Sequence, residues 1–88
     1  MDIAAQLLEL DWPDSFVVRY RDGTTERLLR GDGIHVTPSG DDPDGQGGFS
    51  ADIPKKHPQN QTQCMREVGF HELDSILDDD GNVLFRRP

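Results

Sequence analysis

The amino-acid sequence predicts a mainly β fold (α+β) in which about five strands form a small barrel or a strongly bent sheet, with one helix at the N-terminus. Three observations support this prediction. Two β-rich runs flank the hairpin dipeptide Asp22-Gly23, a second pair of apolar runs flanks the segment DDDG at residues 78–81, and a short amphipathic segment precedes both. The 88 residues are expected to form one domain, residues 1–88, with a small core.

The N-terminal helix is predicted over residues 2–11. Ile3, Leu7 and Leu10 recur at helical spacing on one side of this segment. Pro13 disfavours a helical backbone at the residue before it, so the helix should end near that point. A helix of this length is marginal by itself in water, and we therefore expect it to pack on the sheet.

The first hairpin is predicted from the sequence FVVRYRDGTTERLL, residues 16–29. A two-residue turn at Asp22-Gly23 would place Arg19 opposite Glu26, and the opposite charges of this pair favour that register. Arg19 and Arg21 would then point away from the core face. The side chains expected on the core face are Phe16, Val18, Tyr20 and Leu29.

The middle of the chain predicts a bend and then a long loop. The run Gly31-Asp32-Gly33 indicates a bend or bulge before the next apolar run. Residues 37–63 hold four of the six prolines and four of the nine glycines, which predicts a long flexible loop. Within it, residues 48–53 (GFSADI) alternate as a strand does. Long loops are usually functional or disordered, and the sequence leaves both interpretations open.

Two further strands and a last one are predicted after the loop. Residues 64–77 (CMREVGFHELDSIL) indicate a strand, a bent turn near residues 71–73 and a second strand, and residues 82–88 (NVLFRRP) indicate the last strand. The core is expected to draw on Leu7, Leu8, Trp12, Phe16, Val18, Leu29, Ile34, Val68, Phe70, Ile76, Val83 and Phe85.

The connection DDDGN, residues 78–82, raises the question of a calcium site. An EF-hand alignment with Gly81 at position 6 puts Ile76 at position 1 and Arg87 at position 12, and neither side chain can be a ligand there. Asp and Gly are typical turn residues, so we expect a hairpin turn.

The sequence contains no recognisable catalytic pattern. Cys64 could act as a nucleophile, but no familiar spacing links it to His35, His57 or His71. The segment HELD, residues 71–74, has one histidine and no paired ligand motif, so a polar turn is expected. No phosphate-binding glycine loop, HExxH motif or nucleophile elbow occurs. We expect no enzyme, no cofactor and no metal.

The net charge of the chain indicates which classes of partner it would attract or repel. The chain carries 17 acidic and 9 basic residues, a formal net charge of −8, which repels nucleic acid and anionic lipid overall. No apolar run approaches a membrane span and the N-terminus lacks the basic region of a secretory signal, so a cytoplasmic protein without a membrane partner is expected. Charged side chains proposed for binding are Asp41, Asp42, Asp44, Lys55 and Lys56 in the loop and Arg19 and Arg21 on the hairpin.

The order of elements resembles that of small Sm-like or SH3-like β-barrels. The helical residues 2–11 and the bent hairpin FVVRYRDGTTERLLRGDG carry the resemblance. For Sm-like proteins it implies a five-strand bent sheet and ring assembly on RNA. The acidic balance and the lack of an RNA-binding signature in FHELDSIL depart from that pattern. Such barrels host many functions, and no site residue is transferred from them.

The leading functional hypothesis is a non-enzymatic protein–protein interaction module of bacterial cytoplasmic type. One alternative is an acidic inhibitor that mimics nucleic acid and blocks a basic protein, with its charge supplied by Asp41, Asp42, Asp44 and residues 78–80. The other alternative is an Sm-like RNA-binding barrel that uses the hairpin arginines. The sequence does not determine the oligomeric state or the identity of the partner.

Overall fold

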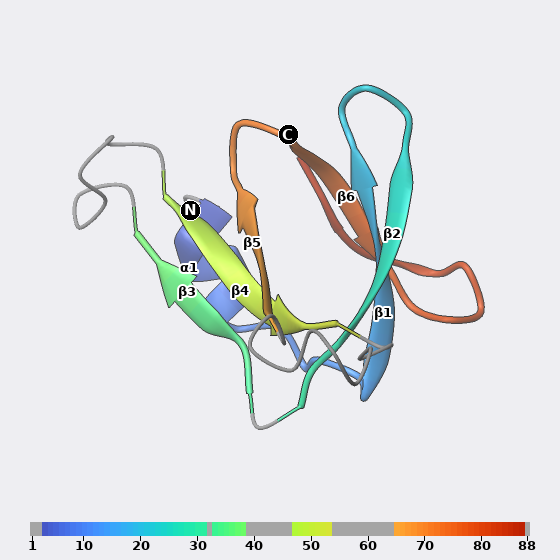
Figure 1. Cartoon of the computed structure of the whole chain (residues 1–88), viewed down its shortest axis with the longest axis horizontal. Helices are drawn as coiled ribbons and strands as arrows, with labels where there is room; N and C mark the ends of the chain where they lie inside the picture. Colours follow the sequence, from blue (N-terminus) through green and yellow to red (C-terminus); the bar gives the residue numbers. More distant parts are fainter. Residues whose placement is uncertain (1–2, 32, 39–46, 54–64, 88) are drawn as a thin grey trace, which may run out of the picture.

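The computed structural model describes residues 3–31, 33–38, 47–53 and 65–87, which form one helix and seven strands (Figure 1). The elements are α1 (Ile3–Leu8), β1 (Ser15–Tyr20), β2 (Thr25–Leu29), β3 (His35–Thr37), β4 (Gly48–Asp52), β5 (Met65–Gly69), β6 (Leu73–Leu77) and β7 (Val83–Arg86). Neighbouring strands pair antiparallel in one curled sheet, a half-barrel. The prediction of a mainly β fold with one N-terminal helix is confirmed, with more strands than expected.

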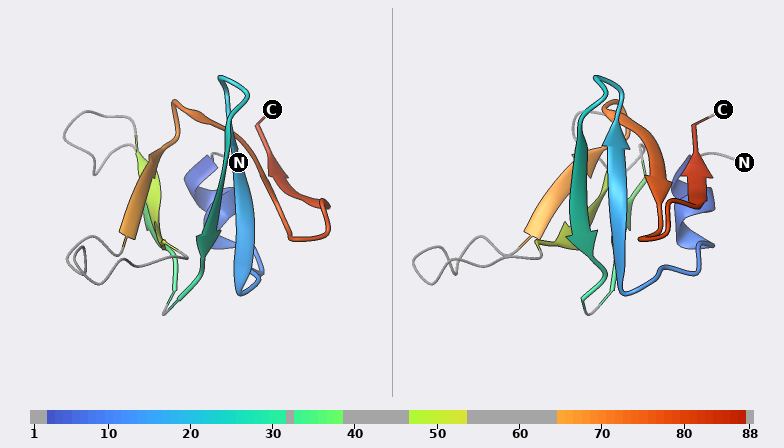
Figure 2. Two further views of the ribbon diagram at one scale, coloured as in Figure 1. Left: turned by 45° about the vertical axis from the view of Figure 1, so that its right-hand side comes forward. Right: turned by 90° about the vertical axis from the view of Figure 1, so that its right-hand side faces the viewer.

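The sheet has two wings that meet at one corner. Strands β2, β1, β6 and β7 lie side by side in that order and form the four-strand wing, which Figure 2 (right) shows face-on. Strands β3, β4 and β5 form the three-strand wing, with β4 in the centre. The wings join where Leu29 of β2 pairs with Asp52 of β4. They are also linked by the turn at residues 70–72, whose Glu72 carbonyl accepts a hydrogen bond from the Arg21 N–H (2.9 Å).

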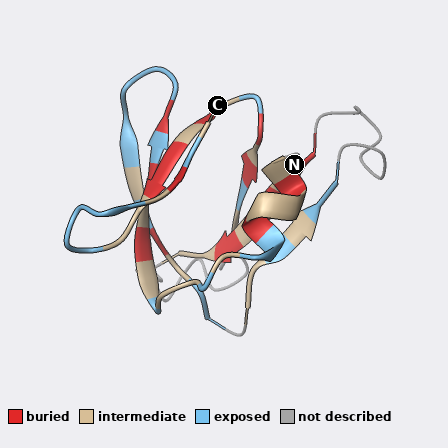
Figure 3. Cartoon of the chain, turned by 180° about the vertical axis from the view of Figure 1, so that it is seen from behind, coloured by how far each residue is buried: buried red, intermediate tan, exposed pale blue. Residues whose placement is uncertain are grey.

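The helix α1 lies against the three-strand wing, on the side seen from behind in Figure 3. Ala4 and Leu7 are buried in the core, whereas Leu8 is 65% exposed. The predicted core position of Leu8 is therefore wrong, because Leu8 lies about 100° around the helix axis from Leu7. The helix ends at Leu8, earlier than predicted. There the Trp12 indole N–H donates to the carbonyl oxygen of Leu7 (3.0 Å), which satisfies one acceptor at the helix C-terminus.

The hairpin between β1 and β2 has a three-residue loop, not the predicted two-residue turn. The Gly23 N–H donates to the carbonyl of Tyr20 (2.9 Å) and the Tyr20 N–H donates to the carbonyl of Thr24 (2.8 Å). Gly23 has a φ of +93°, whereas no residue type other than glycine has positive φ in the described part of the chain. A two-residue type I′ turn needs positive φ at both central residues, and Asp22 does not supply it. Asp22 instead accepts hydrogen bonds from the Thr24 N–H and hydroxyl.

This loop shifts the register between β1 and β2 by one residue. Val18 lies opposite Glu26 and Arg19 lies opposite Thr25, so the predicted Arg19–Glu26 pair is wrong. Because side chains alternate between faces, the shift exchanges the two faces of β2. Leu28 is fully buried in place of Leu29, which is half-buried on the outer face.

The core lies between the wings and the helix. Seven of the predicted core residues are buried, namely Leu7, Phe16, Val18, Val68, Phe70, Ile76 and Phe85. Trp12 and Ile34 pack against this core and are partly buried. The Trp12 ring lies 4.8 Å from the Phe16 ring and 5.6 Å from the Phe49 ring, so it joins the two wings. Val83 is 46% exposed, which contradicts its predicted core position.

The remaining predictions of local structure can be compared in part. Gly31 and Gly33 have φ values of +57° and +142° where the chain bends between β2 and β3, as predicted, while residue 32 lies outside the described residues. Strand β4 confirms the strand expected in GFSADI. The rest of the predicted loop lies mostly outside the described residues, in 39–46 and 54–64. Among the described residues, no helix has the length and apolar character needed to cross a membrane.

The register of the first hairpin predicts different effects for two adjacent leucines. Leu28→Ala should lower the free energy of unfolding by about 2–5 kcal/mol because it leaves a cavity in the core. Leu29→Ala, the matched control, should cost about 1 kcal/mol or less because that side chain lies on the outer face. Denaturant titration of both variants measures the difference. Equal losses, or a larger loss for Leu29→Ala, would contradict the register.

Candidate functional site

The acidic segment between β6 and β7 is a turn, as predicted. The Asp78 carboxylate accepts hydrogen bonds from the N–H groups of Asp80 (2.9 Å) and Asn82 (2.8 Å) and from the Asn82 side chain (3.1 Å). The Asn82 side-chain hydrogen bond, followed by that of the Asn82 backbone, lowers the pKa of Asp78. Asp79 accepts from the Ser15 hydroxyl. Within the described residues, no group of three or more His, Cys, Asp or Glu side chains could hold a metal ion.

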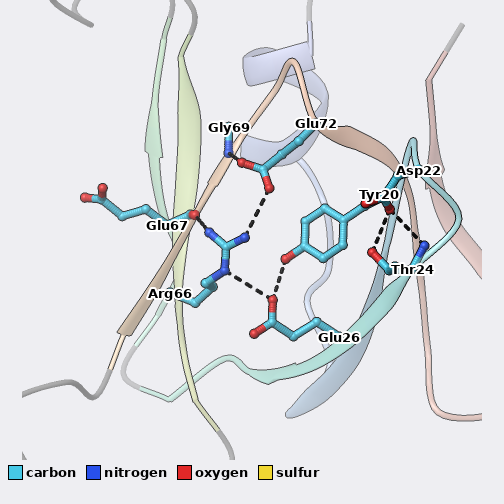
Figure 4. A network of polar contacts seen from close by, with 8 residues as sticks. All are labelled: Tyr20, Asp22, Thr24, Glu26, Arg66, Glu67, Gly69 and Glu72. Carbon is cyan, nitrogen blue, oxygen red and sulfur yellow. Dashed lines mark hydrogen bonds and ion pairs between the residues drawn. The ribbon is translucent and has the colours of Figure 1, made fainter.

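A polar cluster of Tyr20, Glu26, Arg66 and Glu72 connects the two wings (Figure 4). Arg66 comes from β5 in the three-strand wing. Its Nε lies 3.2 Å from Glu26 Oε1 on β2, and its Nη2 lies 3.1 Å from Glu72 Oε1 in the turn before β6. The Tyr20 hydroxyl donates to Glu26 Oε1 (2.5 Å), and the Arg66 guanidinium lies 5.5 Å from the centre of the Tyr20 ring.

Partial burial shapes the electrostatics of this polar cluster. The side chains of Arg66, Glu26 and Glu72 are each about one third exposed, whereas Tyr20 is buried. Burial, and then the hydrogen bond to Glu26, raises the pKa of Tyr20 far above its usual value. Burial opposes the charge on Arg66, but Tyr20, Glu72 and Glu26 outweigh that effect and raise the pKa of its guanidinium. The guanidinium therefore stays charged and links the three-strand wing to Glu26 of the four-strand wing and to Glu72 of the turn that connects the wings.

The contacts of the polar cluster connect its side chains to one another and to the backbone of β5. Arg66 also donates to the carbonyl of Glu67, and the second oxygen of Glu72 accepts from the Gly69 N–H (3.2 Å). The hydroxyl, the guanidinium and both carboxylates are thus engaged with one another within the polar cluster. The polar turn expected in HELD, residues 71–74, is confirmed for His71 and Glu72, whereas Leu73 and Asp74 belong to β6.

The outer face of the four-strand wing carries a row of basic side chains. Arg19 of β1 lies opposite Ser75 of β6, and Ser75 lies opposite Arg86 of β7. Residues directly opposite each other in antiparallel strands share a face, so these three form a line across the sheet, which we call the arginine row. Both arginines are exposed and Ser75 is buried between them. In the described part of the chain, neither guanidinium has a hydrogen bond or an ion pair.

A second line of side chains on the same face is mainly apolar. Val17 of β1, Leu77 of β6 and Val83 of β7 are in register, and we call them the apolar row. Val17 and Leu77 are half-buried and Val83 is 46% exposed. At the β2 end of this line, Arg27 lies 3.4 Å from Asp79. The outer face therefore combines apolar side chains and a paired arginine with the two exposed charges of the arginine row.

Two of the residues proposed for binding from the sequence belong to this region. Arg19 is in the arginine row, and Arg21 is exposed in the hairpin loop beside it, without a side-chain partner among the described residues. The other proposed residues, Asp41, Asp42, Asp44, Lys55 and Lys56, lie outside the described residues, as does Cys64. The sequence did not connect Arg19 with Arg86, or Arg66 with Glu26, since each link needs a strand pairing between distant segments.

The aromatic side chains are not placed for stacking on nucleic-acid bases. Trp12 is partly buried, and the other five are buried in the core, namely Phe16, Tyr20, Phe49, Phe70 and Phe85. Proteins that bind single-stranded nucleic acid commonly expose aromatic rings on which bases stack. The outer face has arginines and aliphatic side chains, a composition closer to that of a protein interface.

Comparisons of the chain with protein-family models, with curated proteins and with solved structures found no match.

The polar cluster predicts an unusual alkaline titration of Tyr20, the single tyrosine of the chain. The folded pKa lies above the unfolded value of about 10, so this group's contribution to stability is present below pH 10 and is lost as the pH rises further. Ultraviolet absorbance of the folded protein should show no tyrosinate at pH 10, where the urea-denatured chain is about half ionised.

Glu26→Gln is the matched variant, because it keeps a hydrogen-bond acceptor and removes the charge. Its tyrosine should ionise at a lower pH than that of the wild type, while tryptophan fluorescence confirms that the protein stays folded. If Tyr20 of the folded wild type ionised together with the denatured chain, the polar cluster would not exist in solution.

Proposed function

We propose that this protein is a non-enzymatic protein–protein interaction module that binds its partner through the outer face of the four-strand wing. The observation that carries this proposal is the arginine row beside the apolar row. Arg19 and Arg86 are exposed charges without partners in the described part of the chain, and Val83 is an exposed apolar side chain next to them. Arginines around an apolar strip are typical of protein interfaces.

The arrangement of the polar cluster favours binding over catalysis. A catalytic group needs a free lone pair or proton that faces a substrate, whereas Glu26 and Glu72 are both engaged in ion pairs with Arg66. In this proposal, the polar cluster stabilises the sheet, and the sheet in turn positions the outer face of the four-strand wing for binding. We further propose a cytoplasmic location and an Sm-like or SH3-like barrel as the fold relationship, on the basis of the bent hairpin and the curled sheet.

The two alternative functions have less support. An acidic mimic of nucleic acid would need free carboxylates, but Asp78 is bound within its own turn and Asp79 contacts Ser15 and Arg27. An Sm-like RNA binder could use Arg19 and Arg86, but it would lack exposed aromatic rings among the described residues and would carry a net charge of −8.

Affinity capture from a lysate of the source organism tests the proposed function. The immobilised protein should retain one or a few proteins after nuclease treatment. Arg19→Gln/Arg86→Gln should lose them, because it removes both free charges of the arginine row. Mass spectrometry and nucleic-acid staining of the bound material measure the outcome.

The matched control is His35→Glu/Thr37→Glu, which changes the formal net charge by the same amount at exposed positions of β3 in the other wing. It should retain the same proteins as the wild type. Bound material that disappears with nuclease would support RNA binding instead. An empty capture, or equal loss in both variants, would contradict an interaction through the outer face.

A further inference from the structure

The strand β7 has an open edge next to the arginine row. The strand order ends at β7, whose neighbour is β6, and no other described strand pairs with it. Figure 2 (right) shows β2, β1, β6 and β7 from left to right. An edge strand presents N–H and C=O groups that can pair with another extended chain.

The hydrogen bonds of β7 show which backbone groups face outward. The Arg87 N–H donates to the carbonyl of Asp74 (3.0 Å), and this pair continues the register in which Arg86 lies opposite Ser75. Hydrogen-bonded and non-hydrogen-bonded pairs alternate along antiparallel strands. The N–H and C=O groups of Arg86 therefore point to the open edge.

At the other end of β7, the Asp78 N–H donates to the carbonyl of Asn82 (2.9 Å). The backbone groups of Val83, which lies opposite Leu77, therefore point to the open edge as well. The pairing shifts register between these two ends, and Leu84 is the extra residue of a bulge.

A strand added to this edge would meet both rows of the outer face. The residue directly opposite Arg86 would share its face and extend the arginine row, so its side chain would lie beside a guanidinium without a partner in the described chain. A carboxylate fits that position because arginine binds carboxylates with two parallel hydrogen bonds. A residue two places along the added strand, on the same face, would lie near Val83, where an apolar side chain fits.

We propose that the partner contributes an extended acidic segment that pairs with the open edge of β7, with a carboxylate at Arg86 and an apolar side chain near Val83. This inference rests on the proposed function and specifies the kind of partner it involves.

The net charge of −8 opposes the approach of an acidic segment from a distance, so the proposed recognition has to act at short range. Long-range attraction does not bring an acidic segment to this protein, and screening limits repulsion to about 8 Å at physiological salt. Backbone hydrogen bonds at the edge and contact with Val83 act at that range, as does the pair with Arg86. A nucleic acid would gain neither the backbone pairing nor the apolar contact, while its many phosphates would be repelled.

Selection from a random peptide library displayed on phage tests the proposal with the full chain as bait. Enriched peptides should have Asp or Glu two residues from an aliphatic residue and should lack proline at that site. Synthetic versions should bind Arg19→Gln/Arg86→Gln about tenfold or more weakly than the wild type. They should bind His35→Glu/Thr37→Glu within about twofold of the wild type.

Amide hydrogen exchange distinguishes edge pairing from other modes of binding. A bound peptide should slow exchange at the amides of Val83 and Arg86, whereas the Phe85 amide, which faces β6, should change little. Enrichment of basic or purely apolar peptides, or slowed amide exchange at residues away from β7, would contradict the proposal of an acidic strand at this edge. Neither result would contradict the proposed protein–protein interaction function. If the library yields no enriched peptide while the lysate still yields bound proteins, the acidic strand is likewise rejected and the interaction module is retained. If the lysate capture is empty, the proposed function itself is rejected.

Two other occupants of the edge would be recognised in the same experiments. Protection of the Val83 and Arg86 amides that rises with protein concentration, without peptide, would show that a second copy of the chain occupies the edge. An oligonucleotide that displaces the selected peptides and binds more tightly than they do would assign the arginines to nucleic acid. Either result would overturn the proposal.

Discussion

The conformation of Gly23 fixes the register between β1 and β2, and both the polar cluster and the outer face of the four-strand wing depend on that register. With positive φ at this one residue, the hairpin loop holds three residues and Val18 faces Glu26. Glu26 then points inward, where it meets Tyr20 and Arg66. Its neighbour Arg27 points outward, toward Asp79. A shift of one residue would exchange these positions and would bring a leucine of the core to the surface.

The two wings are held together by different interactions at different depths. In the centre, Trp12 packs on Phe16 of one wing and Phe49 of the other. At the opening, Arg66 reaches from β5 to the carboxylates of Glu26 and Glu72. A domain of this size buries a small core, and a charged contact that is one third exposed contributes mainly by orienting the wings. Neither of these contacts involves the outer face of the four-strand wing, through which we propose that a partner binds.

Local features of the structure could be predicted from the sequence, and features that need long-range pairing could not. The turn at residues 78–82 was predictable because Asp78 binds groups of its own loop. The position of the hairpin at Asp22-Gly23 was predictable, but its register was not. Leu28 and Leu29 are adjacent and identical, so the sequence does not indicate which of them faces the core. The link of Arg66 to Glu26 and the alignment of Arg19 with Arg86 arise from strand neighbours that lie far apart along the chain.

Nuclear Overhauser effects between backbone protons across β1 and β2 test the register most directly. The structure predicts contacts between Arg19 and Thr25 and between Val17 and Arg27, the pairs that lie opposite each other. Such contacts would confirm the register on which the polar cluster and the arginine row depend. Contacts between Arg19 and Glu26 in their place would show a two-residue turn. They would put Leu29 in the core and Glu26 on the outer face, and they would contradict the account of both surfaces.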